Sequence, residues 1–150
     1  MRAKFVHTNL IAEDWRRLAD FYEQVFGCTP VPPERNLSGP WLEKGTSVPE
    51  VEIWGVHLRL PGYDSRGPTL EIFQYNHLKG RPVPAVNRPG FAHIGFVVDD
   101  VAAARDMVTE AGGRVVGELV SAEIPGAGKI TFVYVADPEG NIIELQKWED

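Results

Sequence analysis

The feature that most constrains the fold of this chain is an internal repeat. Residues 5–27 align without gaps on residues 91–113, at an offset of 86, and five of the 23 positions are identical. Average composition predicts about one or two identities by chance. The identical pairs are Phe5 with Phe91, His7 with His93, Asp14 with Asp100, Asp20 with Asp106, and Gly27 with Gly113. We therefore expect a duplicated module that builds the same local structure twice.

Each copy begins with the pattern of a strand. In residues 5–11 the side chains of Phe5, His7 and Asn9 fall on one face of a period-2 alternation. In residues 91–98 the side chains of Ala92, Ile94, Phe96 and Val98 fall on one face. This face is wholly apolar, so it should pack against a helix.

A helix pattern follows in each copy. Apolar residues recur at helical spacing over 15–25 and again over 101–111. Asp14 and Asp100 precede these segments and can cap the first turns. Gly27 and Gly112–Gly113 suit the helix ends.

Three further strands complete each copy, so that the pattern reads βαβββ twice. In copy one they lie near 30–31, 51–60 and 69–75, and in copy two at 114–122, 129–136 and 141–148. Residues 137–140, Asp-Pro-Glu-Gly, have the composition of a type I turn between the last two strands.

The predicted organisation is a single domain of two modules. Module one covers about 4–76, the proline-containing linker about 77–89, and module two about 90–148. The segment 28–49 holds five prolines and little periodicity, so we expect a long surface loop there.

Composition excludes several classes of protein. The net charge of −6 disfavours nucleic acid as a partner, because phosphate binding needs a basic face. The longest apolar run, 132–136, is too short to span a membrane, and residues 1–14 do not resemble a secretory signal. With Cys28 as the only cysteine the chain forms no internal disulfide, which fits a cytoplasmic protein.

Four side chains form the candidate metal site. His7 and His93 are equivalent in the repeat, and each module ends in a strand that carries a glutamate, Glu71 or Glu144, among apolar residues. A glutamate in a core strand is costly to bury unless it is paired or binds a metal. Imidazole and carboxylate together suit one divalent ion, namely Ni, Co, Zn, Mn or Fe, and the intrinsic affinity order does not choose among them.

These residues resemble a known family. The βαβββ duplication, with His on the first and Glu on the last strand of each module, is similar to the vicinal oxygen chelate superfamily, which includes glyoxalase I, extradiol dioxygenases and bleomycin-binding proteins. The matching segments are 5–10, 21–27, 90–96 and 137–145, the last reading Asp-Pro-Glu-Gly-Asn-Ile-Ile-Glu-Leu. The resemblance covers nearly the whole chain apart from 29–50.

The resemblance implies an α+β fold in which the two modules form a curled mixed sheet around a metal site, with the helices outside. A His-Glu-His-Glu set is closest to glyoxalase I and implies a metal-dependent lyase or isomerase. Such an enzyme abstracts a proton next to a metal-chelated carbonyl and stabilises the enediolate. By analogy Glu144, rather than Glu71, is the preferred base. The implied partners are a small substrate with vicinal oxygens and a second copy of the chain in a homodimer.

Two other functions remain open from the sequence. An extradiol-type dioxygenase would use His7, His93 and Glu144, with Tyr134 as an acid–base helper and Glu71 away from the metal. A metal-free binding protein would need none of these ligands. In the plainest alternative, Glu71 pairs with Arg59 or Arg66 and the strand histidines bond to the backbone. We expect His57 and His77 to be ordinary surface or substrate-facing residues.

Overall fold

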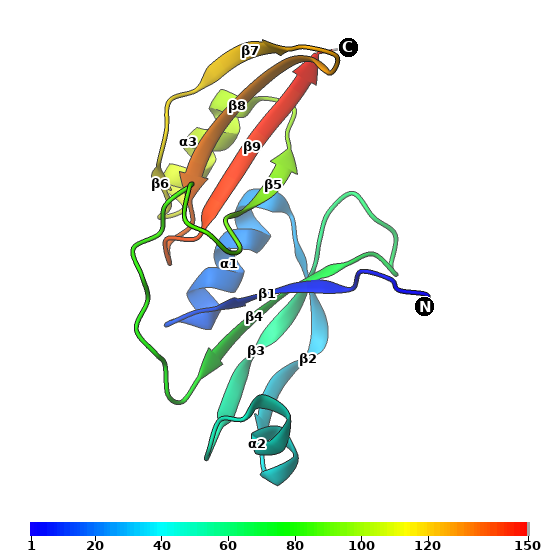
Figure 1. The fold of residues 1–150 in the computed structure, drawn as a ribbon, viewed down its shortest axis with the longest axis vertical. Helices are drawn as coiled ribbons and strands as arrows, with labels where there is room; N and C mark the ends of the chain where they lie inside the picture. The colour runs from blue at the N-terminus through cyan, green and yellow to red at the C-terminus, as the bar shows by residue number, and fades with distance from the viewer. Residues whose placement is uncertain (150) are drawn as a thin grey trace. The chain divides into compact units, whose positions relative to one another are not determined.

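The computed structural model describes residues 1–149 and divides into two compact units. The first unit is Met1–Arg81, and the second begins at Pro82. Each unit contains one mixed β-sheet and one long helix, with a short extra helix in the first (Figure 1). The predicted α+β class and the tandem arrangement of strand–helix–sheet modules are confirmed.

The first unit is a four-stranded sheet in the order β1-β4-β3-β2. Its elements are β1 (His7–Ile11), α1 (Trp15–Phe26), β2 (Thr29–Ser38), α2 (Pro40–Thr46), β3 (Glu52–Arg59) and β4 (Thr69–Tyr75). β1 runs parallel to β4, and the other neighbours are antiparallel. The first and last strands of the module are therefore side by side.

The second unit repeats this order with one strand more. Its elements are β5 (His93–Val97), α3 (Val101–Glu110), β6 (Arg114–Val115), β7 (Val120–Ile124), β8 (Gly128–Ala136) and β9 (Ile142–Glu149). The sheet runs β5-β9-β8-β6, with β7 also paired to β8. β5 is parallel to β9, as β1 is to β4.

The predicted helix caps are confirmed in both units. The Asp14 carboxylate accepts a hydrogen bond from the Arg17 backbone N–H at 3.1 Å, and Asp100 accepts one from Ala103 at 2.9 Å. α1 ends at Gly27, whose φ of 69° is the left-handed conformation that glycine adopts without strain. Within residues 1–149, no helix is long and apolar enough to cross a membrane.

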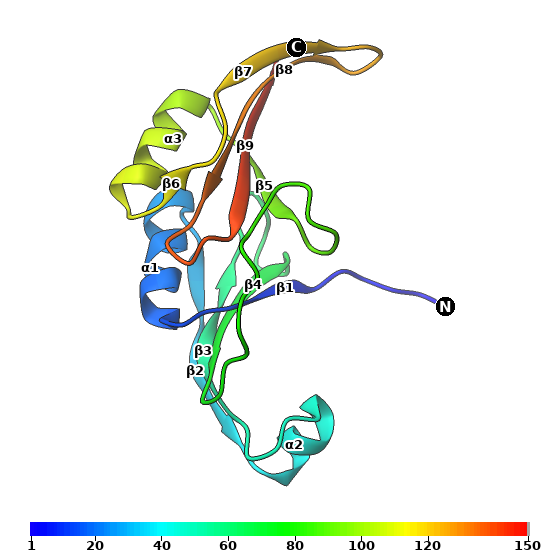
Figure 2. The same cartoon turned by 60° about the vertical axis from the view of Figure 1, so that its left-hand side comes forward.

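The long helix of each unit lies against one face of its own sheet (Figure 2). α1 packs on β3 and β4, and α3 packs on β8 and β9. Buried residues on these helices and strands include Leu18, Ala19, Phe21, Tyr22, Leu58, Leu70 and Ile72 in the first unit, and Val101, Ala104, Val108, Val133, Val135, Ile143 and Leu145 in the second. Because side chains alternate along a strand, residues between these buried positions point to the opposite face of the sheet.

The prediction of a long loop over 28–49 was wrong. This segment forms the ten-residue strand β2 and the helix α2. β2 lies at the edge of its sheet, where proline is tolerated because one row of N–H groups has no strand partner. Pro40 opens α2, and Leu42 packs there with Val51 and Ile53 in a small apolar cluster.

The single strand predicted over 114–122 is instead two strands. β6 and β7 both pair with β8, and the chain between them bends away from the ladder. At the bend the N–H groups of Val116 and Gly117 both donate to the Tyr134 carbonyl. The predicted turn at 137–140 is confirmed, since Gly140 N–H donates to the Asp137 carbonyl at 2.9 Å.

Candidate functional site

In the first unit, His7 and Glu71 lie on the same face of neighbouring strands. The parallel register of β1 and β4 pairs His7 with Thr69 and Asn9 with Glu71. His7 Nε2 lies 3.2 Å from Glu71 Oε2. The Glu71 side chain is 11% exposed, whereas that of His7 is 42% exposed. These two candidate ligands therefore lie close together, and the carboxylate of Glu71 is nearly enclosed.

Two further residues contact Glu71. His57, on β3, stands directly opposite Glu71 in the antiparallel register, and its Nε2 lies 2.9 Å from Oε1. The Asn9 side-chain amide donates to Oε2 at 3.3 Å. The other ring nitrogen of His57, Nδ1, lies 3.5 Å from the Thr69 hydroxyl. Both oxygens of the carboxylate are thus occupied by polar groups of its own unit.

This arrangement bears on one expectation and one alternative from the sequence. His57 was expected to be an ordinary surface or substrate-facing residue, but its side chain is 20% exposed and contacts Glu71. Glu71 pairs with neither arginine: Arg66 lies 3.6 Å from Asp64, and Arg59 reaches the Gly67 carbonyl at 3.5 Å. Sequence reasoning missed His57 because it looked for repeat partners at a constant offset. The signal it needed was the register between β3 and β4.

Burial sets the protonation preference of His57. Removal from water lowers the pKa of His57 below its usual range, although the Glu71 carboxylate opposes this shift. Electrostatic interactions with Arg35 and His7 lower the pKa of His57 further. The neutral imidazole is therefore favoured, with one nitrogen carrying a proton.

The second unit contains the matching pair. His93 Nε2 lies 3.1 Å from Glu144 Oε2, and the two side chains are 32% and 17% exposed. The register of β5 and β9 places Gly95 beside Glu144, at the position that Asn9 has beside Glu71. Tyr134 stands opposite Glu144 on β8, and its ring packs edge-on against His93 with 5.2 Å between the centroids.

Tyr134 therefore occupies the position of His57 in the other unit. Burial, and secondarily the charge of Glu144, raise the pKa of Tyr134 above its ordinary value. The phenol thus keeps its proton over the physiological range. It differs chemically from an imidazole, so the two units are not equivalent around their glutamates.

The donor chemistry of each pair fits a divalent ion. In each pair an imidazole nitrogen and a carboxylate oxygen lie together, 3.2 Å apart in the first unit and 3.1 Å apart in the second. Imidazole nitrogen and carboxylate oxygen are also the donors that Mn, Fe, Co, Ni and Zn share. Among residues 1–149, no group of three or more His, Cys, Asp or Glu side chains is close enough to hold a metal. The predicted ligand set draws one such pair from each unit.

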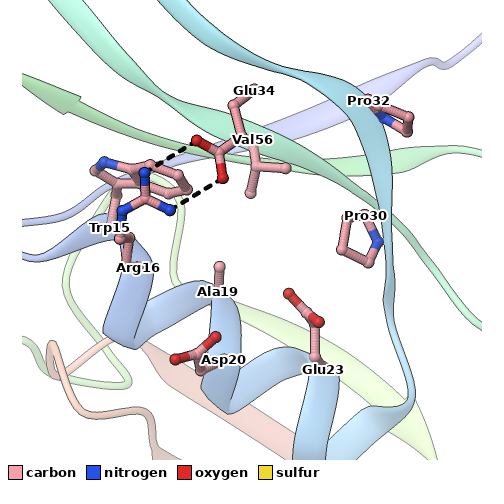
Figure 3. A pocket seen from close by; sticks show the side chains of 9 residues that line it. All are labelled: Trp15, Arg16, Ala19, Asp20, Glu23, Pro30, Pro32, Glu34 and Val56. Atoms are coloured by element: carbon pink, nitrogen blue, oxygen red, sulfur yellow. Dashed lines mark hydrogen bonds and ion pairs between the residues drawn. The ribbon is translucent and has the colours of Figure 1, made fainter.

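A hollow of about 300 Å³ lies elsewhere in the first unit, between α1 and β2 (Figure 3). Arg16 there makes a two-pronged ion pair with Glu34 at 2.9 and 3.0 Å, and its guanidinium lies 4.3 Å over the Trp15 ring. Val56 lines this hollow, and its neighbour His57 points to the opposite face of the sheet. The hollow is thus separate from the His7–Glu71 pair.

The sequence of this chain matches one known superfamily. The sequence model of the Glyoxalase/Bleomycin resistance protein/Dioxygenase superfamily matches residues 4–145. No curated protein sequence matches the chain.

Solved structures resemble the chain in fold. A glyoxalase family protein from Bacillus cereus is 18% identical, with a TM-score of 0.85 over 100% of this chain and 97% of that one. A mutant glyoxalase I from Zea mays is 20% identical, with a TM-score of 0.66 over 98% of this chain and 45% of that one. A fosfomycin resistance protein from Listeria monocytogenes, complexed with Mn(II) and sulfate, is 16% identical, with a TM-score of 0.59 over 99% and 95%. These identities are low, so the likeness shows the fold alone.

Proposed function

The chain belongs to the Glyoxalase/Bleomycin resistance protein/Dioxygenase superfamily, and from that premise we propose that it is a metal-dependent lyase or isomerase of the glyoxalase I type. The observation that carries the proposal is the His–Glu pair in each unit, with Nε2-to-oxygen distances of 3.2 and 3.1 Å. The proposed ligands are His7, Glu71, His93 and Glu144, and they hold one divalent ion. The proposed substrate is a small molecule with adjacent oxygens, and the protein is proposed to act as a homodimer.

The proposed reaction is a proton transfer in which the divalent ion and Glu144 have separate roles. When bound, a divalent ion supplies positive charge that polarises a substrate carbonyl and acidifies the neighbouring C–H. Glu144 accepts that proton on a carboxylate oxygen, and the electron pair of the broken C–H bond moves toward the carbonyl oxygen. Glu144 then returns the proton to the former carbonyl carbon, and the hydroxyl proton on the neighbouring carbon passes to the former carbonyl oxygen, so that the reaction needs no external oxidant or reductant.

The environments of the two glutamates support this assignment of the base. Within the described residues, His93 is the ion-pair partner of Glu144, and the neighbouring strand position is Gly95, which has no side chain. A carboxylate with few partners can reorient toward a substrate. Glu71, by contrast, is contacted by His7, His57 and Asn9.

The test is metal content per chain, measured by plasma mass spectrometry on protein purified without an affinity tag. We expect about one Ni, Co, Zn or Mn ion per wild-type chain, and a sharp loss in Glu71→Ala and in Glu144→Ala. The matched control is Glu110→Ala, because Glu110 is an exposed residue at the end of α3. A chain that binds no metal even when supplied with it would contradict the proposal and leave a metal-free binding protein.

A second function is favoured by one observation, the Tyr134 ring packed against His93 opposite Glu144. A phenol that keeps its proton is suited to serve as an acid–base group in an extradiol-type dioxygenase that uses His7, His93 and Glu144. In the metal measurement this function predicts iron that is retained in Glu71→Ala. Oxygen uptake with catechols would then replace the proton-transfer assay.

A further inference from the structure

We propose that His57 is a positioning residue for Glu71: its Nε2–H donates to Oε1 and leaves Oε2 directed at His7. The inference rests on the proposed function for its purpose, because a fixed Glu71 is useful as a metal ligand. The contact between His57 and Glu71 lies entirely within the first unit.

The geometry favours a hydrogen bond that fixes orientation. His57 and Glu71 are direct partners in the β3–β4 ladder, with 2.9 Å between Nε2 and Oε1. The backbone register thus brings the two side chains together. On the other side of the same carboxylate, His7 and Asn9 both reach Oε2, at 3.2 and 3.3 Å. One oxygen is therefore held by His57, and the other faces the exposed side of β1.

The acceptor opposite His57 requires a proton on Nε2, because a carboxylate oxygen can only accept and Glu71 Oε1 lies 2.9 Å from Nε2. The Nδ1 of His57 lies 3.5 Å from the Thr69 hydroxyl, which can donate to an unprotonated Nδ1. The ring also packs edge-on against Phe73, with 5.7 Å between centroids. Thr69, Glu71 and Phe73 are every second residue of β4, so their side chains share one face of the sheet. This one face orients the imidazole of His57.

The structure argues against His57 as a third metal ligand. His57 and His7 contact different oxygens of Glu71: Nε2 of His57 lies 2.9 Å from Oε1, and Nε2 of His7 lies 3.2 Å from Oε2. His57 thus contacts the carboxylate oxygen that His7 does not. It acts instead as an outer partner that orients a ligand, the role that polar groups behind metal ligands commonly have.

The second unit shows what happens without such a residue. The register position of His57 is taken there by Tyr134, and that of Asn9 by Gly95. Among the described residues neither makes a hydrogen bond to Glu144, which keeps the His93 contact alone. The two units therefore differ around their glutamates. Glu71 has three polar partners, whereas Glu144 has one among the described residues.

The test is the dissociation constant of Co(II) or Mn(II) for the full chain, measured by titration of metal-free protein. We expect His57→Phe to weaken binding by about 10- to 100-fold. His57→Gln should stay close to wild type, because an amide N–H can replace the donor. His77→Gln is the matched control, since His77 is exposed. Equal affinity in His57→Phe and wild type would overturn the inference. So would a loss in His57→Gln as complete as that in His7→Ala, because it would make His57 a ligand.

A double-mutant cycle separates positioning from a general structural role. In a Glu71→Gln background, His57→Phe should cause little further loss of affinity, because the carboxylate that it orients is gone. A full additional loss in that background would overturn the inference.

A further measurement keeps this inference independent of the proposed function. Nitrogen NMR of the metal-free chain should show a proton on His57 Nε2 that changes environment in Glu71→Ala. A proton on Nδ1 instead would overturn the inference. Wild-type protein that binds no metal, yet shows the Nε2 proton, would contradict the proposed function and support the His57 contact.

Discussion

At the scale of single residues, Glu71 shows how a charged group is accommodated inside a sheet. An isolated carboxylate taken out of water costs many kcal/mol, so a buried one needs partners. The whole Glu71 residue is 9% exposed, and its carboxylate is contacted by two imidazoles and one amide. Asp137 follows the same rule: it is 2% exposed and accepts hydrogen bonds from the backbone N–H groups of Glu139 and Asn141.

Cys28 gives a prediction at this scale. The residue is 3% exposed, and burial raises the pKa of the Cys28 thiol to about 11. Because the thiolate is the reactive form, we expect almost no reaction with a disulfide reagent at neutral pH in the folded chain. Full reaction should follow in guanidinium chloride. Rapid labelling of the folded chain at neutral pH would contradict the prediction.

The same shift predicts the pH dependence of stability. An unfolded thiol ionises near pH 8.5, and the raised pKa means that the folded thiol stays protonated at higher pH. The contribution of Cys28 is therefore fully present below about pH 8.5 and is lost as the pH rises toward 11. The midpoint of urea unfolding should fall over this interval, and less steeply in Cys28→Ala.

At the scale of elements, strand pairing decides which residues meet. His57 and Glu71 are separated by 14 residues, and Tyr134 and Glu144 by 10, yet each pair is in register. The difference lies in the connections, a long loop after β3 and a tight turn after β8. Equivalent positions in the two units therefore have no constant sequence offset.

Gly55 gives the prediction for the β3–β4 pairing. A Cβ at this position would overlap the Ile72 carbonyl oxygen and lie 2.9 Å from Phe73 Cα. We expect Gly55→Ala to lower the free energy of unfolding by about 1–3 kcal/mol, as overpacking does elsewhere, measured by urea denaturation. Gly45→Ala in α2 is the matched control, because nothing lies within 4 Å of its added Cβ. An unchanged free energy of unfolding in Gly55→Ala would contradict the prediction. It would mean that β3 and β4 move apart for the added methyl group at no cost.

At the scale of the whole molecule, the proposed ligand set links metal binding to the stability of the chain. A ligand that binds only the folded state stabilises it by about 2.7 kcal/mol at 100 times its dissociation constant. We therefore expect the melting temperature to rise with added divalent metal and to fall with a chelator.

Variants of the repeat-related histidines sharpen this prediction. His7→Ala and His93→Ala, one from each unit, should each abolish most of the metal-dependent rise in melting temperature. His77→Ala should not, because His77 is not a proposed ligand. A rise that survives in either ligand variant would contradict a four-ligand set.

Much of the fold was determined by the sequence itself. Periodicity and capping are local properties, so the strand–helix start of each module, the caps at Asp14 and Asp100, and the turn at 137–140 could be predicted. The repeat also identified His7 and His93 as equivalent. Proline content misled the prediction for β2, because an edge strand tolerates residues that a central strand would exclude.

The tertiary structure alone decided how the glutamates are held. His57 meets Glu71 because β3 and β4 pair in one particular register, and no local pattern around residue 57 specifies that register. The same pairing rule puts Tyr134 and Gly95 around Glu144. Contacts between distant residues depend on strand register and loop length together, so the sequence supplied the ligand candidates while the fold supplied their partners.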